Sequence, residues 1–132
     1  MSLYGIGSDI IDLERVKKSL KNKNFKKKIF SINEIKIIEK KSNKSANYAK
    51  RFAAKEAFSK ALGTGISGGL SFKDISINNN AKGKPYISLL GRTKSIVQRI
   101  IKKKYKIFLT ISDEKKYALA MVVITFWWKK NT

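Results

Sequence analysis

One long segment, residues 47–62, constrains the fold more than any other part of this sequence. It reads N-Y-A-K-R-F-A-A-K-E-A-F-S-K-A-L and is followed directly by Gly63. Alanine is the best helix former, and glycine often follows the end of a helix because it adopts a left-handed backbone at no steric cost. We therefore predict a helix that begins at Ser45 or Ala46, stops at Gly63 and packs an Ala- and Phe-rich face against the rest of the domain.

Shorter elements surround this helix in the sequence. A capping-box pattern at Ser31 and Glu34 predicts a second helix that runs to about Lys41. The segment before it predicts a strand over 3–11, with two glycines where something passes close to the backbone, and then a helix from about Asp12 that fades into the lysines of 21–28. The C-terminal half predicts a hairpin of strands 73–78 and 86–90, a helix over 93–103, and a hairpin of strands 106–112 and 117–127.

These elements predict an α+β fold, because strands and helices are mixed without strict alternation. The length of 132 residues suits one core, so we expect a single domain over 1–132 with antiparallel strands. The last strand is apolar on both faces, which in a small domain indicates burial at a subunit interface. No apolar run reaches the roughly 20 residues of a membrane span and no signal peptide is visible, so we expect a cytoplasmic protein.

Two missing residue types exclude several mechanisms. The chain has no Cys and no His, which removes disulfides, zinc ribbons, thiol nucleophiles and imidazole bases. Its 30 Lys+Arg against 9 Asp+Glu point toward a polyanionic partner. However, 26 of these bases are Lys and only 4 are Arg, a pattern that compositional drift explains equally well. A basic nucleic-acid-binding or ribosome-associated module is the alternative to an enzyme, and an anionic-membrane binder comes third.

Two of the nine acids lie where carboxylates need a specific partner. Asp9 ends the first predicted strand among isoleucines, and Glu56 lies on the Ala- and Phe-rich helix. A carboxylate in packed surroundings is paired, protonated or bound to a metal. A helix salt bridge from Glu56 to Lys60, four residues later, is the simplest alternative for Glu56. A turn or helix N-cap is the corresponding alternative for Asp9.

A glycine-rich loop, G-T-G-I-S-G-G at 63–69, follows this helix. It matches neither the P-loop nor the dinucleotide-binding pattern, but its backbone N–H groups can still bind a phosphate beside Lys60 and near Arg51 and Lys55. Mg²⁺ typically takes one or two carboxylates, waters and phosphate oxygens, and it needs neither Cys nor His. The two carboxylates, the lysine and the loop are thus the parts of a Mg²⁺–pyrophosphate site.

Longer motifs identify a family. The opening G-I-G-S-D-I-I-D-L-E-R and the helix-loop K-R-F-A-A-K-E-A-F-S-K-A-L-G-T-G resemble bacterial holo-[acyl-carrier-protein] synthases, the small phosphopantetheinyl transferases. Supporting matches are G-L-S-F-K-D-I-S-I, G-K-P at 83–85 and L-T-I-S-D-E-K-K-Y-A-L-A. The resemblance covers about residues 3–124.

The resemblance implies an activity and assigns roles to particular residues. It implies Mg²⁺-dependent transfer of 4′-phosphopantetheine from coenzyme A to a serine of apo-acyl carrier protein, which supports fatty acid biosynthesis. Asp9 and Glu56 would hold the metal, and Lys60 would offset charge on the transferring phosphate. Catalysis would then rest mostly on positioning and charge neutralisation, with a water ordered by Asp9 or Glu56 taking the serine proton. The residues implied to line the coenzyme A pocket are Arg51, Phe52, Ser59, Gly63, Thr64, Gly65, Gly83, Lys84 and Pro85.

The resemblance also implies the partners of the chain. An acidic carrier protein would dock on a basic first helix, which here carries Arg15, Lys18 and Lys21. Family members are homotrimers with active sites between protomers, and such an assembly would bury the apolar last strand. No nucleic acid is implied. Many members carry a His where this chain has Asp113, so a role for that His does not transfer, and we leave Asp113 out of the predicted site because its charge would repel phosphate.

Overall fold

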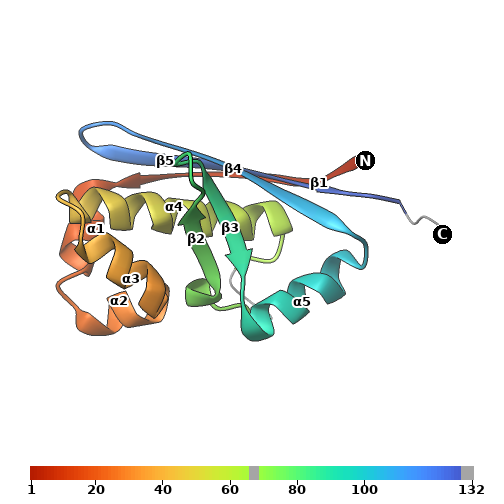
Figure 1. The fold of residues 1–132 in the computed structure, drawn as a ribbon, viewed down its shortest axis with the longest axis horizontal. Coiled ribbons are helices and arrows are strands. Elements are labelled where there is room, and N and C mark those ends of the chain that lie inside the picture. The colour runs from red at the N-terminus through yellow and green to blue at the C-terminus, as the bar shows by residue number, and fades with distance from the viewer. Residues whose placement is uncertain (66–68, 129–132) are drawn as a thin grey trace.

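The computed structural model describes residues 1–65 and 69–128. Its longest helix, α4, spans Lys44–Leu62, and Gly63 follows with a left-handed φ of 91°, as predicted. Figure 1 shows α4 lying along a layer of long strands, with α1–α3 gathered near one end of α4 and α5 near the other. The helices before and after α4 are α1 (Leu13–Ser19), α2 (Lys23–Ile29), α3 (Ile32–Glu39), the 3₁₀ turn η1 (Phe72–Asp74) and α5 (Gly91–Ile101).

The strands form two antiparallel sheets, and both predicted hairpins are confirmed. The small sheet pairs β2 (Ile75–Asn79) with β3 (Pro85–Leu89). The larger sheet has the order β1-β5-β4, so the last strand lies between the other two. Its members are β1 (Ser2–Asp12), β4 (Tyr105–Asp113) and β5 (Tyr117–Phe126). This arrangement confirms the α+β class.

Two glycines let α4 approach β1 closely. A Cβ atom on Gly5 would overlap the carbonyl oxygen of Ala61, and one on Gly7 would overlap that of Ala57. The two backbones can therefore lie close together, because β1 has no side chain at these two positions and α4 presents small residues toward them. The prediction that something passes close to the backbone at these glycines is confirmed, and the structure identifies it as the backbone of α4.

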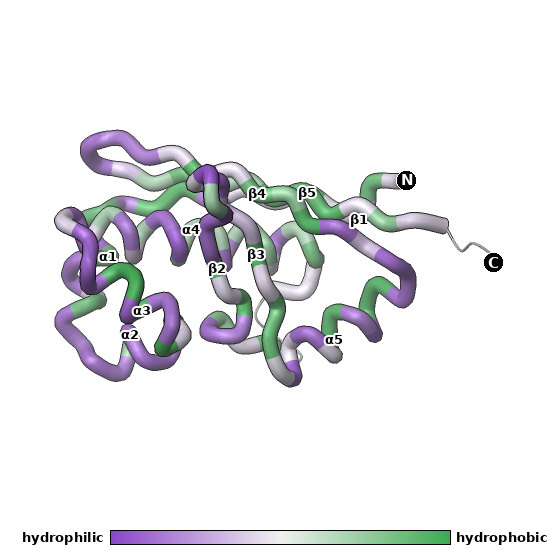
Figure 2. The backbone as a smooth tube through the Cα atoms, viewed as in Figure 1, coloured by the Kyte–Doolittle hydropathy of each residue, from purple (hydrophilic) through white to green (hydrophobic). Residues whose placement is uncertain are grey.

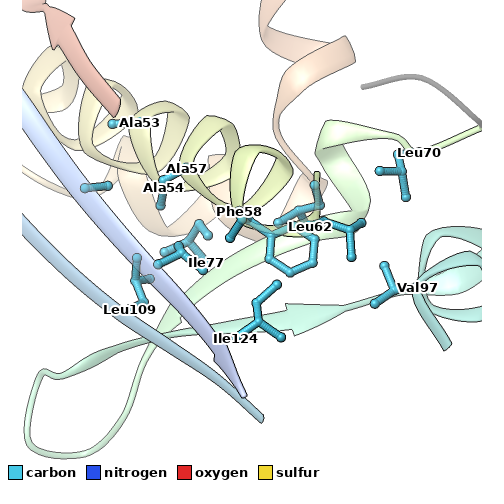
Figure 3. Packing of buried hydrophobic residues seen from close by; sticks show 14 of the residues in the cluster. Ala53, Ala54, Ala57, Phe58, Leu62, Leu70, Ile77, Val97, Leu109 and Ile124 are labelled. Carbon is cyan, nitrogen blue, oxygen red and sulfur yellow. The ribbon is translucent and has the colours of Figure 1, made fainter. Parts of the chain in front are cut away.

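The main core lies between α4, the larger sheet, the β2–β3 hairpin and α5. Figure 3 shows Phe58 and Leu62 of α4 gathered with Ile124 of β5 and Val97 of α5. On β5 every second residue is fully buried: Ala120, Val122 and Ile124 face this core, and Ala118 packs in a separate, smaller one. This alternation fixes the register of β5, because a slip by one residue would expose the whole set.

The first predicted helix differs from the observed one. We expected it to fade into the lysines of 21–28, whereas α1 ends at Ser19 and a separate helix, α2, begins at Lys23. The side chain of Asn22 accepts a hydrogen bond from the N–H of Asn24 at 2.8 Å and so caps α2. Phe30, directly after α2, is buried and gives this basic segment an anchor in a second, smaller core.

The outer face of the larger sheet is apolar and exposed. On β5, Leu119 and Met121 are 46% and 43% exposed, and on β1, Ile6 and Ile10 are 58% and 63% exposed. Figure 2 shows hydrophobic stretches along β4 and β5, in contrast to the mostly hydrophilic α1–α3. Within the described residues, no helix has the length and apolar character needed to cross a membrane.

Candidate active site

Asp9 and Lys60 meet where α4 crosses β1. The ammonium of Lys60 donates to Asp9 Oδ1 at 2.9 Å and to the carbonyl oxygen of Ser8 at 3.0 Å. The Asp9 side chain is only 14% exposed, whereas that of Lys60 is 52% exposed. The close packing at Gly7 brings the two elements within reach of this ion pair. Asp9 is therefore held at the base of the site, and Lys60 extends from it toward solvent.

Glu56 lies on α4 one turn before Lys60 and is half-buried. Burial raises the pKa of the Glu56 carboxyl, the negative charge of Asp9 raises it further, and Lys60 partly opposes both effects. Two carboxylates that repel each other in partly buried surroundings form a site that favours a cation. Oxygen donors of this kind suit Mg²⁺, which takes one or two carboxylates and completes its shell with water and phosphate.

The two simpler interpretations of these acids do not hold in the structure. Lys60 pairs with Asp9, and no ion pair within 4.0 Å joins it to Glu56 among the described residues. The cap of α1 is Asp12, which accepts from the N–H of Glu14 at 2.8 Å, so Asp9 is not the helix cap. Glu56 thus has no ion pair within 4.0 Å among the described residues, whereas Asp9 is paired with Lys60.

A pocket of about 330 Å³ opens beside the two carboxylates. Phe52 forms part of its wall, and Arg15 lies at its α1 side. The pocket therefore combines three acids (Asp9, Asp12 and Glu56), an aromatic wall and one of the predicted docking residues. Arg15 and Lys18 are exposed on α1, while Lys21 is exposed in the turn that follows α1.

The glycine-rich loop is described only at its two ends. Gly63 and Gly65 have positive φ angles of 91° and 61°, and Thr64 between them donates through Oγ1 to the carbonyl oxygen of Gly65 at 3.0 Å. Residues 66–68, on which part of the predicted phosphate loop falls, lie outside the described residues. Ser59 is buried and donates to the carbonyl oxygen of Glu56 at 2.9 Å. Its assignment to the coenzyme A pocket stays a prediction.

A second pocket, of about 520 Å³, contains Arg51 together with Gly83 and Pro85 of the β2–β3 turn. The guanidinium of Arg51 is almost fully buried, with Nη2 donating to Asn79 Oδ1 at a long 3.5 Å. Its Nε has no hydrogen-bond partner among the described residues. Burial lowers the pKa of Arg51. A buried cation with an unsatisfied N–H is well suited to bind an anion.

The predicted site residues are therefore divided within one chain. Arg51 and Phe52 are neighbours on α4 but line different pockets, and these two pockets share no lining residue. Lys84 is exposed in the β2–β3 turn. Asp113, which we left out of the predicted site, lines the Arg51 pocket. Lys50 lies beside it, with its Nζ 4.0 Å from Asp113 Oδ1.

The structure assigns Lys55 a structural position that the sequence did not reveal. Its ammonium is fully buried and donates to Glu34 Oε1 at 2.7 Å and to the carbonyl oxygens of Phe72 and Ile75 at 2.8 and 2.6 Å. All three donors of this ammonium are therefore used within the fold, so Lys55 has none left for a phosphate. The only sequence signal was the capping box of Glu34, which is confirmed but says nothing about a partner 21 residues away.

The fold and the site define a class of transferase. This chain belongs to the 4′-phosphopantetheinyl transferase superfamily, whose family model matches residues 5–122. Its relatives there are holo-[acyl-carrier-protein] synthases. The one from Pelagibacter ubique is 50% identical over 125 residues, which are 94% of this chain and 98% of the relative. The one from Aliivibrio fischeri (strain MJ11) is 44% identical over 93% of this chain and 98% of its own length.

Solved structures agree with this assignment. A Bacillus anthracis holo-(acyl-carrier-protein) synthase in complex with CoA (3′,5′-ADP) has a TM-score of 0.80 and 35% identity, over 96% of this chain and 100% of that chain. A Helicobacter pylori holo-[acyl-carrier-protein] synthase in complex with coenzyme A has a TM-score of 0.78 and 34% identity, over 91% of this chain and 99% of that chain. These likenesses favour the enzyme over the nucleic-acid-binding alternative.

Proposed function

We propose that this chain transfers 4′-phosphopantetheine from coenzyme A to a serine of apo-acyl carrier protein, releasing adenosine 3′,5′-bisphosphate, as a step that supports fatty acid biosynthesis. The observation that carries the assignment to these residues is the cluster of Asp9, Glu56 and Lys60 at the crossing of β1 and α4. The names of the relatives and the coenzyme A bound in two of their structures support the same substrates.

The two carboxylates suit a magnesium ion, which would neutralise charge on the pyrophosphate when bound. Asp9 and Glu56 would hold it, since both offer oxygen ligands and the charge of Asp9 already disfavours a second bare carboxylate nearby. Lys60 supplies the cation of the site: its side chain is half-exposed, and its ammonium donates to Asp9 and to the carbonyl oxygen of Ser8. We expect it to turn toward the transferring phosphate.

The attacking serine must lose its proton during the transfer, and this chain has no His to accept it. A water ordered by Asp9 or Glu56 fills that role in our proposal. The rest of the catalysis is positioning, because phosphoryl transfer needs little covalent chemistry from the protein.

We infer that a complete site needs two copies of the chain. The carboxylate pocket and the Arg51 pocket share no lining residue within one chain, although both contain residues implied to bind one coenzyme A. The exposed apolar face of the larger sheet offers a surface for association. A homotrimer that buries this face and places the Arg51 pocket of one copy beside the carboxylates of the next would unite the two halves.

The carrier protein would approach along α1. Arg15 lines the carboxylate pocket and is exposed. Lys18 lies three residues later on α1, on the same side of the helix. An acidic carrier would be steered to these cations, with Lys21 in the following turn adding to the field. Contacts of this kind mainly raise the association rate and depend on salt concentration.

A single assay tests the proposal. The full chain is incubated with coenzyme A, Mg²⁺ and an apo-acyl carrier protein, and the mass of the carrier is then measured by mass spectrometry. We expect a gain of one phosphopantetheine, which chelation of the metal by EDTA prevents. The variants Asp9→Asn and Glu56→Gln should lose the transfer while keeping the fold. Unchanged transfer by both variants would refute the metal assignment, and salt-dependent RNA binding without any transfer would favour the alternative.

A further inference from the structure

The Arg51 pocket carries more positive charge than its walls neutralise. Three cations line it, and Asp113 is the one acid among its lining residues: the cations are Lys41, Lys50 and Arg51. Arg51 is nine-tenths buried and its Nε has no hydrogen-bond partner among the described residues. A pocket of about 520 Å³ with this charge fits a nucleoside that carries a phosphate.

Lys50 and Asp113 lie together at this pocket. Lys50 comes from α4, directly before Arg51, and Asp113 is the last residue of β4. Their charged atoms are 4.0 Å apart, and their side chains are 31% and 41% exposed. An ion pair this long and this exposed to solvent is weak, so a better partner for either charge can replace it.

A phosphate monoester is such a partner for Lys50. It carries close to two negative charges at neutral pH and offers three acceptor oxygens, against one charge on a carboxylate. In the proposed reaction the pyrophosphate of coenzyme A lies at the Asp9–Glu56 carboxylates, so the group left for a separate cationic pocket is the 3′-phosphate. The product, adenosine 3′,5′-bisphosphate, keeps that phosphate.

We propose that Asp113 competes with the substrate's 3′-phosphate for Lys50: Lys50 pairs with Asp113 in the empty pocket and with the 3′-phosphate in the loaded one. This inference rests on the proposed function and adds a specificity residue, Lys50, and a positioning residue, Asp113. Lys50 selects nucleotides that carry the 3′-phosphate. Asp113 recaptures Lys50 when the phosphate leaves, which lowers affinity for the product and favours its release.

The test compares two nucleotides that differ in this one group. Isothermal titration calorimetry with the full chain measures the Kd of adenosine 3′,5′-bisphosphate and of adenosine 5′-monophosphate. We expect Lys50→Gln to weaken and Asp113→Asn to tighten binding of the bisphosphate, each about two- to fivefold, while the monophosphate is unaffected. The double variant should match Lys50→Gln, because Asp113 acts through Lys50. Lys94→Gln, exposed on α5, removes the same charge elsewhere and should change neither Kd.

Transfer kinetics give a second measurement. Adenosine 3′,5′-bisphosphate should inhibit the Asp113→Asn variant at a concentration about two- to fivefold lower than it inhibits the wild type, because the variant should bind it more tightly by the same factor. The exchange is refuted if Asp113→Asn leaves the bisphosphate Kd unchanged, if both nucleotides shift alike, or if the tightening persists when Lys50 is absent. In each of these cases wild-type transfer and bisphosphate binding remain intact. If the wild type neither transfers nor binds the bisphosphate, the proposed function fails and the exchange fails with it.

Discussion

The carboxylate of Glu34 and the ammonium of Lys55 form a fully buried ion pair at 2.7 Å. Glu34 also accepts from the N–H groups of Ser31 and Ile77, both at 2.9 Å. Lys55 also donates to one carbonyl oxygen in η1 and one at the start of β2. The pair thereby joins α3, α4 and β2 at one point. Every donor of the ammonium has a partner, which makes the burial of two charges tolerable.

Removal of one partner should be strongly destabilising. We expect Glu34→Ala to lower the free energy of unfolding by about 3–5 kcal/mol, because it leaves a buried ammonium without its counter-charge. Burial already lowers the pKa of Lys55, so this ammonium depends on Glu34 to stay ionised. Urea denaturation followed by circular dichroism measures the loss. Glu14→Ala on the exposed side of α1 is the control and should change stability by no more than about 0.5 kcal/mol.

Glu56 should show the opposite behaviour. Because its pKa is raised in the folded protein, its ionised form is disfavoured there, and its charge costs stability once the pH exceeds the unfolded value of 4.5. In the absence of metal, Glu56→Gln should raise the melting temperature at pH 7 by about 1–2 °C, a small effect because solvent screens the half-buried site. The gain should vanish below pH 4.5.

A thermal melt of the metal-free protein at several pH values measures this difference. Glu114→Gln, an exposed acid near the β4–β5 turn, is the control and should show no such pH-dependent gain. A lower melting temperature for Glu56→Gln at pH 7 would mean that Glu56 supports the fold rather than a ligand. The same variant should lose transfer, so that stability and activity change in opposite directions.

Gly7→Ala should disrupt the site through the backbone. The added methyl group would overlap the Ala57 carbonyl oxygen and so push β1 away from α4. We expect a loss of about 1–3 kcal/mol in stability and a large loss of transfer, because Asp9 would move away from Lys60. Ser95→Ala, exposed on α5 and away from this contact, is the control and should retain both properties. Full activity of Gly7→Ala would contradict the close approach.

The proposed trimer predicts that a charge on the outer sheet face separates the copies. Met121→Glu places a carboxylate on an exposed apolar surface, which a monomer tolerates and a buried interface does not. Light scattering after gel filtration should show a monomer with a folded circular dichroism spectrum and little transfer. Lys94→Gln changes the net charge equally and should leave the assembly intact. A wild-type chain that is already monomeric would refute the trimer.

Local sequence patterns determined the elements themselves. The Ala-rich helix that ends at Gly63 and the capping box at Ser31 are decided by hydrogen bonds and backbone preferences within a few residues, so they could be predicted. The division between α1 and α2 was missed because a run of lysines hides the cap at Asn22. The scarcity of acids singled out Asp9 and Glu56, and the motifs around them identified the family.

The tertiary structure decided which of these groups meet. Sequence spacing suggested that Lys60 pairs with Glu56, but the close contact of β1 with α4 presents Asp9 instead. The partners of Lys55 and Lys50 lie 21 and 63 residues away, at Glu34 and Asp113. Helix periodicity sets which face of a helix a residue occupies, whereas the packing of distant elements sets what that face touches. For that reason the candidate residues of the site could be selected from the sequence, whereas the pairs that they form could not.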